Sequence, residues 1–347
     1  MMQDRDITLD VAKGILIILV VLGHGIQFSL GAEYTLSETF FDDIVFKSIY
    51  SFHMPLFMII SGYLFYHSNK NNYKTLAASK LIAIGIPMIT FNFLCDLFLY
   101  ASYLKNGDII HCLRQFASST MDGGAMWYLF SILLNMAIVG ITTRVIKDKR
   151  TQYACFFILF ASSFFIPDTI IRFEHKNMFP FFITGYCLKE HNISLYTGSK
   201  NMFYLVFLSL FSVLAIAWFD KDTYIYTSGF CIVGDYSNQL FINIKRILIG
   251  LVVSYTFMQI VHIITTSMSR HLNILNHLGR TSLFIYGSNI AFDIYYFKIS
   301  SVFGINFPFN YIVPILFTLF VIVISTIMYR LLEKKSITRV LFLGKYK

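Results

Sequence analysis

The stretch ILIILVVLGHGIQF, residues 15–28, is an apolar run that contains one ionisable ring, His24, and Lys13 stands just before it. At about 100° per residue, a separation of eleven positions brings Lys13 and His24 to one helix face, roughly 16 Å apart along the axis. An ionisable side chain inside a membrane helix indicates a functional site. The first helix is therefore predicted to cross a membrane with a polar stripe on one face.

The composition is that of a membrane protein. Of the 347 residues, 14% are charged and 56% hydrophobic, with a mean hydropathy of +0.64, whereas soluble domains average about 25% charged residues. A hydrocarbon core of about 30 Å takes about 20 apolar residues per helix. We predict an all-α bundle of about ten transmembrane helices, forming a single membrane domain over 1–347, with spans at 8–29, 44–66, 79–101, 126–146, 153–171, 177–189, 201–219, 246–266, 281–301 and 309–330.

The distribution of lysine and arginine predicts the orientation of these spans. Cytoplasmic loops retain basic residues, and placing the N-terminus in the cytoplasm puts most of the 28 basic residues on that side. An even number of spans then places the C-terminus there as well. The net charge of +9 follows from this orientation, so nucleic acid is not an expected partner. The five cysteines show no metal-ligand spacing, and no metal is expected.

The start of the first span offers candidate catalytic residues. Asp10 and Lys13 are three positions apart and can pair on the helix surface; the alternative for Lys13 is a purely orienting anchor. The glycines that flank His24 permit close approach, and burial favours the neutral ring that a general base requires. A histidine that only hydrogen-bonds a neighbouring helix is the alternative interpretation.

The second span carries another histidine, His53, at a predicted depth comparable with that of His24. Pro55 frees a backbone carbonyl and bends the helix, so a polar pocket that joins the two histidines is plausible. A structural hydrogen-bond donor is an equally good interpretation of His53.

Further polar residues are candidates for substrate contacts. Asn92 and Asp96, and likewise Asn289 and Asp293, are spaced four apart and so share helix faces. Intramembrane polar groups usually face the bundle interior, and Asp293 is the strongest of these candidates. Arg172, Glu174 and His175 cluster in a predicted outer loop and are candidates for binding a substrate. The alternative is a solvated charged loop. Aromatic residues in the long stretch 220–243 suggest a sugar-binding hairpin or an interfacial belt.

Two blocks of sequence stand out in the first two predicted spans. They read Leu9-Asp10-x-x-Lys13-Gly14 leading to Gly23-His24, and Phe52-His53-Met54-Pro55-Leu56-Phe57 with Ile60-Ser61-Gly62-Tyr63-Leu64. Together they resemble the membrane acyltransferase 3 family, especially its sugar O-acetyltransferase branch, which is fucose 4-O-acetylase-like. Weaker matches extend the resemblance over nearly the whole chain: Met126-Trp127-Tyr128-Leu129, Gly185-Tyr186 and Leu278-Gly279-Arg280-Thr281-Ser282-Leu283-Phe284-Ile285-Tyr286.

The resemblance implies an integral O-acyltransferase of the bacterial inner membrane. It would transfer acetyl from acetyl-CoA to a sugar hydroxyl of a polysaccharide or lipid-linked sugar, such as O-antigen, capsule or exopolysaccharide. His24 matches the essential histidine of the family, and Lys13 stands where many members carry arginine. Many members also have a histidine near the position of Asn289.

The resemblance and the residues together give a set of expected roles. His24, Lys13, Asp10 and His53 are the expected catalytic residues, Lys13 also contacts acetyl-CoA, and Asp293, Arg172 and Glu174 bind the acceptor. Membrane lipid surrounds the helices. A transporter or flippase for a glycan or lipid-linked sugar is the alternative function, because buried Asp and His residues also serve proton relays and substrate paths.

Overall fold

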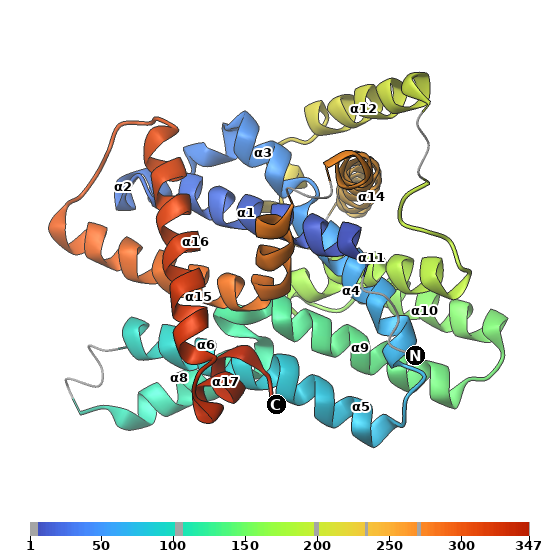
Figure 1. The fold of residues 1–347 in the computed structure, drawn as a ribbon, viewed down its shortest axis with the longest axis horizontal. Coiled ribbons are helices and arrows are strands. Elements are labelled where there is room, and N and C mark those ends of the chain that lie inside the picture. The colour runs from blue at the N-terminus through green and yellow to red at the C-terminus, as the bar shows by residue number, and fades with distance from the viewer. Residues whose placement is uncertain (1–5, 101–106, 198–200, 233–234, 269–271, 347) are drawn as a thin grey trace. The chain divides into compact units, whose positions relative to one another are not determined.

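The computed structural model describes residues 6–100, 107–197, 201–232, 235–268 and 272–346, and over these ranges the chain is all helical (Figure 1). The only extended pairing within them is an isolated antiparallel bridge between Gly31 and Asn306. Helical structure satisfies backbone hydrogen bonds within each segment, as a hydrocarbon environment demands. The all-α prediction is confirmed.

In the described part of the chain, six helices are long and apolar enough to cross a membrane, and Met202–Ala217 is a shorter apolar helix. The protein is therefore a multi-pass membrane protein. The count of about ten spans and the side on which the termini lie remain predictions. The six ranges are Ile7–Phe28, Ile44–Ser68, Tyr73–Leu99, Ile109–Val145, Tyr236–Met268 and Ile312–Leu332.

The chain forms two compact units, each assembled from separate segments. Unit 1 comprises Met1–Ile49, Ser79–Leu129 and Arg270–Lys347, and unit 2 comprises Tyr50–Ala78 and Phe130–Ser269. The chain therefore passes repeatedly from one unit to the other, and sequence distance says little about which helices pack together.

Unit 1 is built around α1 (Ile7–Phe28) and α15 (Asn273–Phe303). Their contacts advance together along both helices, from Asp10 beside Gly279 to Ser29 beside Tyr296, so the two helices run parallel. A Cβ at Gly279 would lie 1.8 Å from the carbonyl oxygen of Asp10, and one at Gly14 would lie 2.0 Å from that of Leu275. Small residues thus bring the two backbones into direct contact, a common way of packing membrane helices.

The remaining elements of unit 1 pack around this pair or connect it. Helix α6 contacts α15, and α16 contacts both α1 and α15. The short α17 packs on α6. These elements are α2 (Ala32–Ser37), η1 (Thr39–Asp42), α3 (Ile44–Tyr50), η2 (Leu81–Gly85), α6 (Ile86–Leu99), α8 (Ile109–Asp122), η3 (Gly124–Met126), α16 (Ile312–Leu332) and α17 (Ser336–Leu343).

Unit 2 contains a second parallel pair, α4 (His53–Ser68) and α11 (Phe173–Glu190). The glycine arrangement recurs: a Cβ at Gly62 would lie 2.0 Å from the carbonyl oxygen of Phe182, and one at Gly185 would lie 1.9 Å from that of Ile59. The other elements that lie in or reach this unit are α5 (Tyr73–Lys80), α9 (Trp127–Val145), α10 (Lys149–Ser163), α12 (Met202–Ala217), η4 (Lys221–Thr223), α13 (Ile225–Ser228) and α14 (Tyr236–Met268).

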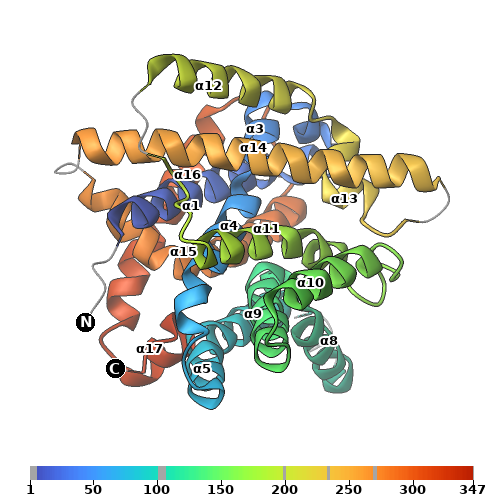
Figure 2. The same ribbon diagram turned by 90° about the vertical axis from the view of Figure 1, so that its right-hand side faces the viewer.

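Helix α12 lies alongside the long helix α14 (Figure 2). Two hydroxyl pairs join them, Ser212 Oγ with Thr256 Oγ1 at 2.6 Å and Tyr204 with Tyr255 at 2.9 Å. Most other α12 side chains are exposed, including Phe203. Polar contacts between helices and apolar side chains on the outer surface are the pattern expected in lipid.

Two helices extend beyond the spans predicted within them. Helix α14 begins at Tyr236, ahead of the span at 246–266, and α15 begins at Asn273, ahead of the span at 281–301. The cations Lys245, Arg246 and Arg280 therefore lie within helices. Lys245 and Arg246 are buried and paired with groups in the chain. The sixth helix, predicted at 177–189, is α11 and is longer at both ends.

Candidate active site around His24

Helix α1 places the candidate catalytic residues on one continuous scaffold. Asp6 caps its N-terminus by accepting a hydrogen bond from the backbone N–H of Leu9 at 3.2 Å, which satisfies one of the free donors of the first turn. The helix then runs without interruption through Lys13 to Phe28. The geometry of a single helix therefore fixes the separation of Lys13 and His24 at roughly 16 Å.

His24 lies against two polar side chains of α15. Its Nδ1 is 2.7 Å from Asp293 Oδ2 and 3.0 Å from Asn289 Nδ2. Asn289 donates a hydrogen bond to the same Asp293 oxygen at 2.9 Å. The predicted sharing of a helix face by Asn289 and Asp293 is confirmed, and α15 turns that face toward α1.

The Asp293 carboxylate favours one tautomer of the His24 ring. In it, Nδ1–H donates to that carboxylate, which also accepts from Asn289; Asn289 Nδ2 and His24 Nδ1 are then both donors and make no hydrogen bond to each other. The neutral ring then carries its lone pair on Nε2, an atom with no hydrogen-bond partner among the described residues. A carboxylate that orients histidine in this way also stabilises the imidazolium that forms when Nε2 takes a proton.

The neighbourhood of His24 combines burial with a partly open ring. The side chain of Asp293 is 4% exposed and that of His24 is 17% exposed. Asn289 Oδ1 and Asp293 Oδ1 are buried and have no hydrogen-bond partner within the described ranges. Buried acceptors without partners are unusual, and both of these belong to the residues that contact His24.

A second polar centre lies at the start of α1. Lys13 Nζ is 2.8 Å from Asp10 Oδ1, which confirms the pairing predicted from their spacing. Arg280 of α15 approaches the other carboxylate oxygen at 3.5 Å. The Asp10 side chain is 4% exposed, whereas that of Arg280 is 48% exposed. One buried carboxylate therefore holds two cations where the helices meet, and their other N–H groups can bind an anion.

His53, the other candidate catalytic histidine, belongs to unit 2. It is the first residue of α4 and is buried, and its ring lies 4.8 Å from that of Tyr50, edge to face. The helix is interrupted at Ser51 and Phe52, between α3 and α4, where Pro55 lacks the N–H that would bond to the carbonyl of Ser51. The bend at Pro55 stays a prediction. The meeting of His53 with His24 stays a prediction.

Arg172 and Glu174 lie at the beginning of α11 in unit 2. Two guanidinium nitrogens of Arg172 donate to the Glu174 carboxylate, at 3.2 and 2.6 Å. His175 Nδ1 lies 2.6 Å from Ser131 Oγ. Glu174, His175 and the next two residues are buried, so the alternative of a solvated charged loop is wrong: this turn is enclosed by protein because its charges are paired.

The aromatic stretch after α12 is not a hairpin. It forms η4 and α13, and Tyr224 and Phe230 are buried core residues. Burial favours a higher pKa for the Asp220 carboxyl, but hydrogen bonds from Lys245 and Thr223 outweigh it, and the pKa lies below its ordinary value. The loop is thus tied to α14, and these two aromatic rings are not available to stack on a sugar.

Two further polar residues of the predicted spans have structural partners in unit 1. Asn92 donates to the carbonyl of Gly123 and accepts from the N–H of Met126, both at 3.0 Å. Asp96 accepts a hydrogen bond from Ser119. These contacts hold α8 and η3 against α6, and neither residue touches His24 through a hydrogen bond.

Sequence reasoning assigned no role to Arg280 and none to Asn289 at the histidine. Arg280 lies in the block Leu278–Tyr286 that carried the weaker resemblance, and Asn289 was noted only as a departure from it. The spacing of Asn289 and Asp293 was visible in the sequence, but the helix against which they pack was not.

The geometry can be compared with known proteins. The chain matches nodulation protein NolL of Sinorhizobium fredii with 29% identity over 238 residues, which cover 65% of this chain and 61% of the relative. The match to NolL of Mesorhizobium japonicum has 27% identity over 236 residues, with 65% and 60% covered. The chain thus spans about three fifths of the length of these relatives. No solved structure matches.

A family model described as an acyltransferase domain matches residues 6–330. This range contains α1, α15, both polar centres and the two parallel helix pairs. The suspected resemblance is therefore confirmed over nearly the whole chain, and the protein belongs to this family of acyltransferase domains.

Proposed function

We propose that this protein is a membrane O-acyltransferase that moves an acetyl group from acetyl-CoA to a sugar hydroxyl. The observation that carries the proposal is His24 in an apolar helix, with Nδ1 held by the buried Asp293 and Nε2 without a partner among the described residues. Family membership supports acyl transfer as the reaction. A positioned base typically contributes about 10²- to 10⁴-fold to such a step.

In the proposed reaction, His24 Nε2 takes the proton of the sugar hydroxyl while the oxygen attacks the thioester carbonyl carbon. The new C–O bond forms and the C–S bond breaks. The departing CoA sulfur takes the proton from the imidazolium, which leaves an O-acetyl sugar, free CoA and a neutral His24. Asp293 stabilises the imidazolium and Asn289 holds Asp293 in place, so both act through the histidine.

The centre at the start of α1 is the proposed contact for the anionic part of acetyl-CoA. Lys13 and Arg280 share Asp10 but retain unused N–H groups. Lysine is a point charge, whereas arginine has a planar fork that binds phosphate with two hydrogen bonds. Arg280 on α15 is exposed and therefore provides the guanidinium group that Lys13 on α1 lacks.

The proposed acceptor is a polysaccharide or lipid-linked sugar at the bacterial inner membrane. Arg172 and Glu174 are proposed as acceptor contacts, with the Arg172 guanidinium as the donor, since its side chain is 31% exposed. The buried Glu174 carboxylate orients that guanidinium. His53 is retained as a proposed catalytic residue of unit 2.

The test is the O-acetyl content of surface polysaccharide, measured by proton NMR. Cells that lack the protein are complemented with wild type, His24→Ala or His67→Ala at equal membrane abundance. His67 is the control, because it is an exposed histidine near the end of α4 with no side-chain hydrogen bond among the described residues. We expect acetyl signals with wild type and His67→Ala and a loss of at least about 100-fold with His24→Ala.

Other outcomes would contradict the proposal. Full acetylation with His24→Ala would exclude the histidine as the essential base. A change in the amount of polysaccharide without a change in acetylation would favour transport over transfer.

A further inference from the structure

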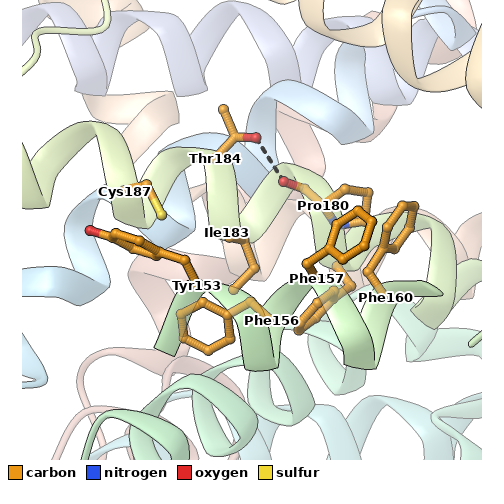
Figure 3. A pocket seen from close by; sticks show the side chains of 9 residues that line it. Tyr153, Phe156, Phe157, Phe160, Pro180, Ile183, Thr184 and Cys187 are labelled. Atoms are coloured by element: carbon orange, nitrogen blue, oxygen red, sulfur yellow. Dashed lines mark hydrogen bonds between the residues drawn. The ribbon is translucent and has the colours of Figure 1, made fainter. Parts of the chain in front are cut away.

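An open apolar groove runs between α10 and α11 within unit 2, with a volume of about 330 Å³ (Figure 3). One wall consists of four aromatic side chains of α10, namely Tyr153, Phe156, Phe157 and Phe160. Their spacing of i, i+3, i+4 and i+7 places them on one helix face. Pro180 and Ile183 of α11 are part of the opposite wall.

Exposed apolar side chains accompany the groove. Phe157, which lines it, is 70% exposed, and Ile158 of α10 and Phe165 just after α10 are exposed to a similar degree. Large exposed apolar patches mark surfaces that contact a partner or a membrane. In a multi-pass membrane protein, lipid chains are the apolar partner present everywhere along such a surface.

One end of the groove opens at a polar network. The hydroxyl of Tyr153, which lines the groove, donates to Glu190 Oε2 at 2.7 Å and lies 2.9 Å from His191 Nε2. Lys149 pairs with the same Glu190. The groove is therefore amphipathic, with aromatic walls and an ionic end.

Cations outnumber carboxylates at that ionic end. The end of α9, the start of α10 and the end of α11 contribute Arg144, Lys147, Lys149, Arg150 and Lys189, against Asp148 and Glu190. Asp148 is engaged as the N-cap of α10 through Thr151. The side chains of Lys147 and Arg150 are exposed and have no hydrogen-bond or ion-pair partner among the described residues. This surface suits a phosphate group.

The length of the groove fits one lipid chain. Seven residues separate Tyr153 from Phe160, which corresponds to about 10 Å along α10. One leaflet of a bilayer supplies a chain region of about 15 Å, half of the hydrocarbon core. The groove is thus too short for a packed helix of a partner protein. It matches most of the length of one acyl chain, which would start at Tyr153, about one turn of α10 from the cations.

We propose that the groove between α10 and α11 binds an anionic phospholipid. One acyl chain lies along the aromatic wall, and the phosphate lies at Lys147 and Arg150. This binding is distinct from acyl transfer at His24 and does not depend on the proposed function.

The test measures lipid retained by the purified full chain. Detergent-solubilised protein is incubated with phosphatidylglycerol and phosphatidylcholine of identical acyl chains, and the lipid bound per protein is determined by mass spectrometry. We expect wild type to retain phosphatidylglycerol preferentially. In Lys147→Gln/Arg150→Gln the preference falls on the order of tenfold, because each cation near a phosphate contributes a few-fold in affinity.

Matched controls separate the groove from general effects. Lys334→Gln/Lys335→Gln removes two exposed cations from unit 1 and leaves the preference unchanged. Phe157→Ala lowers phosphatidylglycerol retention severalfold, whereas Phe203→Ala, at a side chain 81% exposed on α12, does not. Both aromatic positions are exposed, so neither truncation opens the core.

Three results would overturn the proposal. The first is equal retention of the two lipids by wild type, and the second is an equal loss in the control double variant. The third is unchanged retention in Phe157→Ala, which would show that charge alone attracts lipid and that the groove holds no chain.

Discussion

At the scale of single residues, the proposed chemistry depends on an asymmetry between the two nitrogens of one ring. Nδ1 of His24 faces a carboxylate, and Nε2 has no partner among the described residues. A neighbouring group that fixes one nitrogen decides which proton the other can accept. The side chains that do this, Asp293 and Asn289, come from a helix more than 260 positions away in the sequence.

Replacing Asp293 tests this asymmetry. In Asp293→Asn the side chain no longer provides a charged acceptor for Nδ1–H, and the ring loses its fixed tautomer and the stabilisation of its cation. We expect kcat for acyl transfer to fall by about 10²- to 10⁴-fold, with little change in KM for the acyl donor. The measurement is steady-state kinetics on purified protein.

The control for that prediction is Asp222→Asn, which removes an exposed carboxylate from η4 in unit 2. Partial recovery of kcat in Asp293→Glu would identify the carboxylate as the active feature. Near wild-type kcat in Asp293→Asn would show that Asp293 does not orient His24.

At the scale of elements, both units use the same device, a parallel helix pair with a glycine on each helix facing the backbone of the other. In unit 1 this contact lies three turns before His24, so the close approach of α1 and α15 helps to set the distance between His24 and Asp293. A helix pair held farther apart would lengthen the hydrogen bonds at the histidine.

Gly279→Ala should disrupt the pair in unit 1. The added Cβ would lie 1.8 Å from a backbone carbonyl oxygen of α1, which cannot rotate away as a side chain can. We expect a destabilisation of about 3 kcal/mol, at the upper end for overpacking, seen as a lower apparent Tm in detergent. In Gly25→Ala the nearest atom would be 3.1 Å away, and the loss of Tm should be much smaller. Equal Tm values for the two variants would contradict this account.

The buried Arg246 of α14 should be essential to the loop that follows α12. It donates to the carbonyl of Thr223 at 2.7 Å and to Ser228 Oγ and Asn243 Oδ1, both at 2.5 Å. Arg246→Met leaves these acceptors without a partner, at a cost of about 1–3 kcal/mol each when buried. We expect tryptic cleavage after Lys221 to accelerate on the order of tenfold or more.

Arg150→Met is the control for the loop, because the Arg150 side chain is exposed and has no hydrogen-bond or ion-pair partner in the described part of the chain. An unchanged cleavage rate in Arg246→Met would show that the loop is held by its aromatic core alone.

At the scale of the whole molecule, the chain passes repeatedly between its two units, and the basic residues of the connections predict how it is oriented in the membrane. We expect both termini on the cytoplasmic side. A reporter that is active only in the cytoplasm should be active when fused to either end. Activity at one end alone would require an odd number of spans and would overturn the predicted count.

The sequence by itself determined the helical class, the membrane location, the family resemblance and the residues of α1. These follow from hydropathy and spacing along one segment, which are local properties. The helices α14 and α15 extend beyond the spans predicted within them, because cations are tolerated inside a helix of a folded chain when they are buried with partners, as Lys245 and Arg246 are.

Only the tertiary structure decided what stands beside His24. Asn289 and Asp293 could be assigned to one face of a helix from their spacing, but the packing of that face on α1 depends on glycine contacts between segments at opposite ends of the chain. The same holds for Arg280 on Asp10 and for the burial of Glu174. Spacing in a sequence specifies one face of one helix, whereas a site requires two faces to meet, and close packing of backbones determines which faces do so.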